Sequence, residues 1–193
     1  VLKYSFLIII AGSVSMILLD LDKFMIGKLI KIDNIAYYSV AIFIATVIAV
    51  PARAMNQITN PLTASYLNNN DKDDLVQLYK KSSINLFIIG GFIFVLIVIN
   101  INELYELLNE EYRQGLFIVI IVSSVKLFEN LLGNNNAILF NSNYYRIILV
   151  FGVCIVLFAI LLNYLLIPEY GINGAAVASF IAFMVYGILK IWY

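Results

Sequence analysis

A stripe of polar side chains lies in an apolar part of the chain. The segment PARAMNQITNP, residues 51–61, directly follows the apolar run AIFIATVIAV. Four of its polar residues have the spacing i, i+3, i+4 and i+7, which places them on one face of an α-helix: Arg53, Asn56, Gln57 and Asn60. An arginine can bind phosphate oxygens through two parallel hydrogen bonds, and amides can make further polar contacts. The spacing therefore predicts a helix face suited to a polar or anionic ligand.

A second polar stripe occurs in residues 115–140, within the run LFIVIIVSSVKLFENLLGNNNAILF. At about 100° per residue on a helix, the polar and small residues of this run share an arc of roughly 140°. They are Ser123, Lys126, Glu129, Asn130, Gly133 and Asn134. Counted from the expected helix starts, Lys126 and Arg53 would both lie near the middle of a hydrocarbon core about 30 Å thick.

Two interpretations of the stripes stay open. The groups can satisfy one another, with Lys126 paired to Glu129, Arg53 paired to an acid on another helix, and amides joining the helices. Alternatively, the stripes line a polar cavity that a substrate crosses, which is favoured because the groups form stripes rather than isolated pairs. This second interpretation makes the following residues candidates for a substrate path: Arg53, Asn56, Gln57, Asn60, Lys126, Glu129 and Asn130.

The composition places these stripes in a membrane. Of 193 residues, 63% are hydrophobic and 12% are charged, whereas soluble domains average about 45–50% apolar residues. A soluble domain of this size could not bury so much apolar surface. The 12 basic and 12 acidic residues give zero net charge, so no basic field favours nucleic acid. The sequence has no histidine and one cysteine, Cys154, so we expect no enzymatic activity, metal site or cofactor.

Six segments are apolar and long enough to cross a bilayer, which takes about 20 residues per helix. The chain is therefore predicted to be an all-α polytopic membrane protein whose residues 1–193 form a single six-helix bundle. Residues 72–82 are expected to form a separate short surface helix. The second span contains Pro51 and Pro61, so it should be kinked or tilted. The expected spans are 4–27, 36–66, 83–99, 115–140, 145–167 and 173–193.

The orientation follows from lysine and arginine in the short connections. Six basic residues fall on one side and four on the other, and the side with more faces the cytoplasm. The connection around Lys80 and Lys81 is then cytoplasmic, and the acidic connection around Glu110 and Glu111 faces outward.

Several stretches resemble those of a known transporter family. LDKFMIGKLI, followed by IAYYSVAIFIATVIAVPARAMNQITNPLTASYL, resembles the start of the C-terminal half of Wzx-type polysaccharide and O-antigen flippases. DLVQLYKKS, ELLNEEYRQGLFIVIIV and LNYLLIPEYGINGAAVASFIAF agree with the same family. These flippases belong to the multidrug/oligosaccharidyl-lipid/polysaccharide (MOP) exporter superfamily, together with the MATE transporters. The resemblance covers nearly the whole chain, as helices seven to twelve of a twelve- to fourteen-helix transporter.

The resemblance implies the C-terminal lobe of a MATE-like flippase fold. Two six-helix bundles would face each other across a central cavity and alternate their access to the two sides. The cargo would be an undecaprenyl-diphosphate-linked oligosaccharide, moved across the cell (inner) membrane in the biosynthesis of polysaccharide such as O-antigen or lipopolysaccharide. The partners would be membrane lipid, this cargo and the missing N-terminal six-helix half. Because Val1 already lies within an apolar segment, the sequence suggests a fragment.

The leading alternative is a cation-coupled drug exporter of the same superfamily. Such a protein needs a carboxylate in the membrane that is free to bind a proton or sodium, and Asp20, Asp22 or Glu129 could serve. A membrane enzyme acting on surface sugars is disfavoured because histidine and any loop rich in catalytic polar groups are absent. A purely structural subunit is disfavoured by Arg53 and Lys126 at membrane depth.

Overall fold

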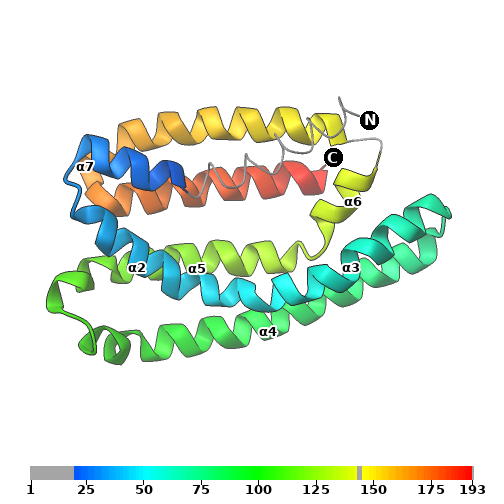
Figure 1. The fold of residues 1–193 in the computed structure, drawn as a ribbon, viewed down its shortest axis with the longest axis horizontal. Coiled ribbons are helices and arrows are strands. Elements are labelled where there is room, and N and C mark those ends of the chain that lie inside the picture. Colours follow the sequence, from blue (N-terminus) through cyan, green and yellow to red (C-terminus); the bar gives the residue numbers. More distant parts are fainter. Residues whose placement is uncertain (1–19, 143–144, 193) are drawn as a thin grey trace.

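The computed structural model describes residues 20–142 and 145–192, and these residues are almost entirely helical (Figure 1). Residues 20–29 form the first described helix, and no β-strand occurs in the described ranges. The predicted all-α class is therefore confirmed. The following elements are α2 (Asn34–Thr46), the 3₁₀ helix η1 (Val47–Ala49), α3 (Val50–Asn68), α4 (Lys72–Glu106), the 3₁₀ helix η2 (Glu110–Gly115), α5 (Leu116–Leu131), α6 (Asn135–Asn141) and α7 (Tyr145–Trp192).

Four helical stretches of the described residues are long and apolar enough to cross a membrane: Asn34–Asn68, Lys72–Glu106, Glu110–Leu131 and Val150–Trp192. The predicted span 4–27 lies outside the described residues except for its last eight, which are helical. The count of six spans in one bundle therefore stays a prediction.

α7 consists of two arms rather than one straight helix. Gly171 has φ 59° and ψ −138°, a left-handed conformation that glycine adopts without a steric penalty. Figure 1 shows the two arms running in opposite directions, and Ile155 and Ala159 of the first arm pack against Ala182 of the second. The turn lies between the two spans predicted at 145–167 and 173–193.

The predicted kink in the second span is confirmed. The 3₁₀ helix η1 separates α2 from α3 and ends two residues before Pro51. Proline lacks an N–H donor and its ring crowds the preceding turn, so the helix tightens there. Pro61 lies inside α3, which continues to Asn68.

The prediction of one continuous helix over 115–140 is wrong. α5 ends at Leu131, and α6 begins at Asn135 after a turn in which Gly133 has φ 56°. A Cβ at Gly133 would also collide with the Ser83 side chain on α4. The left-handed backbone and the close approach both require glycine, and α6 turns away from α5 toward α7 (Figure 1).

The surface helix expected over 72–82 is not separate but forms the start of α4. The 35 residues of α4 measure about 52 Å at about 1.5 Å per residue, longer than a hydrocarbon core of about 30 Å. Figure 1 shows the hairpin of α3 and α4 extending past the end of α5. We infer that this hairpin reaches beyond the bilayer.

The exposed surface is apolar and the interior is rich in small residues. Phe43 and Phe92 are 76% and 66% exposed, which suits contact with lipid chains. Ala178 and Ala182 of α7 are almost fully buried, so the small residues of the GINGAAVASFIAF segment allow close packing between helices. α5 lies at the centre, in contact with α2, α4 and α7. These features indicate a multi-pass membrane protein.

Candidate functional site

The two predicted polar stripes meet at one cavity of about 290 Å³. It lies between α3, α5, the turn after α5 and the second arm of α7. Of the seven predicted substrate-path residues, Asn60 lines a neighbouring cavity, and Gln57 is exposed and lines neither. The polar residues around the 290 Å³ cavity are Arg53, Asn56, Lys126, Glu129, Asn130, Asn135, Asn136 and Lys190.

Lys126 is held inside the bundle by a pair on its own helix. Its side chain is nearly buried, and Nζ lies 2.8 Å from Oε2 of Glu129. The Phe183 ring centroid on α7 lies 5.4 Å from the same Nζ, which adds a cation–π contact. The predicted pairing of Lys126 with Glu129 is confirmed, and it neutralises the charge of this lysine.

Arg53 is exposed at the cavity, and within the described ranges no ion pair joins it to an acid. Its depth differs from the expectation. Asn130 Nδ2 of α5 donates to the Ile48 carbonyl oxygen at 3.0 Å, so these two residues lie at the same depth along the bundle. α3 and α5 run in the same direction (Figure 1). Arg53 lies five residues beyond this level and Lys126 four before it, an offset of about 13 Å at about 1.5 Å per residue. Arg53 and Lys126 therefore line the same cavity but lie at different depths in the membrane.

Two amides of the second stripe join helices. Asn130 is buried and, besides its bond to Ile48, lies against Gly90 of α4, where a Cβ would collide with it. Asn134 donates from Nδ2 to Thr63 Oγ1 of α3. The interpretation of the stripe as interhelical contacts therefore holds for Asn130 and Asn134.

Lys190 is a third cation of the cavity, and sequence reasoning missed it. Its Nζ donates to Asn136 Oδ1 at 2.9 Å and lies 3.7 Å from the Tyr186 ring centroid. The i, i+4 spacing of Tyr186 and Lys190 on an apolar helix was the available signal.

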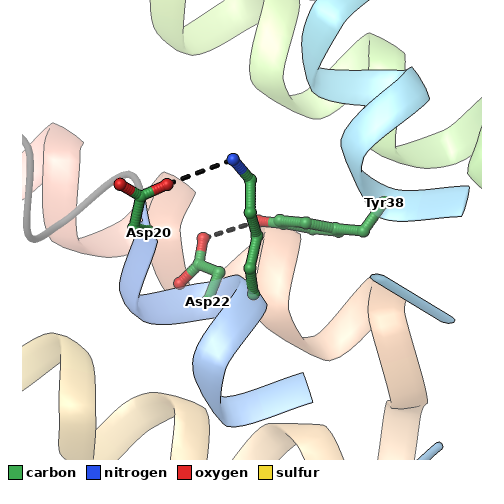
Figure 2. A network of polar contacts seen from close by, with 4 residues as sticks. Asp20, Asp22 and Tyr38 are labelled. Carbon is green, nitrogen blue, oxygen red and sulfur yellow. Dashed lines mark hydrogen bonds and ion pairs between the residues drawn. The ribbon is translucent and has the colours of Figure 1, made fainter. Parts of the chain in front are cut away.

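Asp22 forms a second polar site in the interior. The carboxylate is 3% exposed and accepts three hydrogen bonds from neutral donors: Tyr38 OH at 2.5 Å, Ser179 Oγ at 2.5 Å and Asn163 Nδ2 at 2.8 Å. The donors come from α2 and from both arms of α7, and Figure 2 shows the contact with Tyr38. No salt bridge reaches Asp22 among the residues that the structure describes.

The other two candidate coupling carboxylates have basic partners. Asp20 is exposed and forms a 3.1 Å pair with Lys23, apart from the Asp22 contacts (Figure 2). Glu129 is bound to Lys126. Of the three carboxylates, Asp22 alone is buried and has no ion pair among the described residues. Its negative charge is therefore the one that a bound proton or cation would stabilise most by neutralising it.

A small cavity lies between the two polar sites. It measures about 20 Å³, which is room for about one water molecule, and its lining includes Asp22, Ser179, Lys126 and Phe183. Lys126 and Phe183 also line the 290 Å³ cavity. Because Asp22 and Lys126 line the same small cavity, a change of charge at Asp22 would alter the electrostatic potential at Lys126.

No protein-family model matches the chain, and no curated protein matches it. A solved structure similar to the chain is described as the outward-facing conformation of a multidrug resistance MATE family transporter of the MOP superfamily. The TM-score is 0.80, and the match covers 99% of this chain. The chain has the fold of part of a MATE transporter.

This likeness agrees with the MATE-like fold that the sequence resemblance implies, while the six-helix count and the C-terminal position of the lobe stay predictions. At 17% sequence identity the likeness concerns the fold and not the cargo. The chain spans 43% of the length of that MATE transporter.

Proposed function

We propose that the chain is one lobe of a MOP-type exporter that moves a lipid-diphosphate-linked oligosaccharide across the cytoplasmic (inner) membrane. The observation that carries this proposal is the charge of the 290 Å³ cavity. Its described lining contains three cations, Arg53, Lys126 and Lys190, and one acid, Glu129. Charged side chains are costly at membrane depth, and an excess of cations there favours an anionic cargo.

A diphosphate suits these cations chemically. Glu129 already neutralises Lys126, whereas Arg53 and Lys190 take part in no described ion pair. The planar fork of an arginine matches two phosphate oxygens, and a lysine supplies a point charge.

The offset between the cations suggests an order of binding. In the predicted orientation, α3 and α5 run from the outside toward the cytoplasm, so Arg53 lies nearer the cytoplasm than Lys126. A lipid diphosphate entering from the cytoplasmic leaflet would meet Arg53 first and Lys126 about 13 Å farther outward. The diphosphate would then compete with Glu129 for Lys126.

We propose Asp22 as the coupling carboxylate of the transport cycle. A proton or sodium ion bound there would neutralise a buried charge that is now held only by neutral donors. The water-sized cavity between Asp22 and Lys126 supports an effect of this neutralisation on the cargo site. The remaining length of the transporter would supply the facing lobe, and the cycle needs no cofactor.

A multidrug exporter is the second candidate. It is favoured by the description of the similar MATE structure and by the aromatic rings of Phe183 and Tyr186, which line the cavity and can contact organic ions. The three cations disfavour a positively charged drug, because like charges repel.

Deleting the gene of the complete transporter should abolish the surface glycan and leave drug susceptibility unchanged. Lipid-linked intermediates should accumulate on the cytoplasmic side because their export is blocked. Glycan staining, lipid extraction and inhibitory concentrations of organic cations provide the measurements, with the restored gene as control. Normal glycan together with raised drug susceptibility would favour the multidrug exporter.

A further inference from the structure

We refer to the 290 Å³ cavity lined by Arg53, Lys126 and Lys190 as the cationic cavity. A second cavity, of about 360 Å³, lies beside it between α3 and α6. Its volume is within the range of about 300–1,000 Å³ that small-molecule sites occupy. Its described lining contains no charged residue and is dominated by amides. We refer to it as the amide cavity, and its polar and aromatic residues are Asn56, Asn60, Asn134, Asn136, Phe140 and Asn141.

Two of these amides, Asn134 and Asn60, have groups that are available for hydrogen bonds to a ligand. Asn134 is 2% exposed and uses its Nδ2 on Thr63, but its Oδ1 has no hydrogen-bond partner among the described residues. Asn60 lines the amide cavity with an exposed side chain. A buried acceptor without a partner is costly, so a ligand or water that donates to Asn134 would be bound favourably.

The chemistry of this lining favours a carbohydrate. Sugar hydroxyls both donate and accept hydrogen bonds, and each asparagine amide does the same without adding charge. The Phe140 ring offers an apolar face for the C–H side of a sugar ring. A phosphate would find no cation in the described lining of this cavity.

We propose that the amide cavity binds the sugar next to the diphosphate of the cargo, while the cationic cavity binds the diphosphate itself. The two cavities share Asn56, Gly133 and Asn136, so they lie next to each other. In the cargo, the first sugar is likewise bonded directly to the diphosphate. This inference rests on the proposed function and adds a specificity site to it. A lipid diphosphate without sugar would leave these amides unpaired and would bind less tightly.

The test compares two probes on the complete transporter purified in detergent: farnesyl diphosphate, and farnesyl diphosphate carrying one N-acetylglucosamine. By titration calorimetry, we expect the wild type to bind the glycosylated probe about tenfold more tightly. Asn60→Ala and Phe140→Ala should each weaken binding of the glycosylated probe by about tenfold and change binding of the plain probe by less than about twofold.

The controls separate this inference from the proposed function. Asn69→Ala, in the loop between α3 and α4, should change neither affinity, and Arg53→Gln should weaken both probes equally. Equal wild-type affinity for the two probes, or an equal loss of both in the Asn60 and Phe140 variants, would overturn the sugar site and leave the diphosphate site standing. A wild type that binds neither probe would overturn both. Gel-filtration profiles of all variants identify any that are misfolded.

Discussion

Replacing Arg53 by glutamine in the complete transporter should abolish surface-glycan export without lowering the amount of protein in the membrane. Arg53 is exposed at the cavity and forms no described ion pair, so its loss leaves no acid unpaired and should not unfold the bundle. A charge-assisted hydrogen bond contributes about 1.5–3 kcal/mol, so the transport rate should fall about 10- to 150-fold.

Glycan staining and immunoblotting of the same cells measure this prediction. Arg53→Lys should keep part of the activity, because it preserves the charge but not the planar fork. Arg113→Gln serves as a matched control, since Arg113 pairs with Glu106 at a helix end away from the cavity. Normal export by Arg53→Gln, or a loss explained by missing protein, would mean that Arg53 serves helix packing.

Replacing Asp22 by asparagine should uncouple transport while preserving the fold. The amide Oδ1 can accept the bonds from Tyr38 and Ser179. Asn163 now donates from Nδ2 to Asp22, so its amide must flip to present Oδ1, which can then accept from the new Nδ2. The hydrogen-bond network can therefore survive, but the titratable charge cannot. If coupling contributes about 1–3 kcal/mol, gradient-driven transport should fall about 5- to 150-fold.

The measurement is transport in liposomes under an imposed proton or sodium gradient. Asp20→Asn is the matched control and should behave as the wild type, because Asp20 is exposed and contacts Lys23 rather than the Asp22 network. Unchanged gradient dependence in Asp22→Asn would remove Asp22 from the cycle.

The sequence allowed the polar stripe of α3, the kink before Pro51 and the Lys126–Glu129 pair to be predicted, because each depends on spacing along one helix. It did not reveal the break at Gly133. A lone glycine is tolerated in helical patterns, and the approach of Ser83 from α4, which requires glycine there, is visible only in the folded structure. A contact between helices leaves no local signature.

The same limit applies to the two polar sites. Asp22 was a candidate, but its partners Asn163 and Ser179 lie 141 and 157 residues away, each as one polar residue in an apolar run. The shared cavity of Arg53 and Lys126 was predicted from their stripes, whereas their offset in depth depends on the register between Asn130 and Ile48. Packing between helices sets that register.

The most direct test of the central claim is the movement of a fluorescent farnesyl-diphosphate-linked sugar across liposomes that contain the complete transporter. We expect saturable movement in the wild type and little above protein-free liposomes in Arg53→Gln. The proposed function would be contradicted if the wild type moved the probe no faster than protein-free liposomes do, while moving an organic cation across the same membrane.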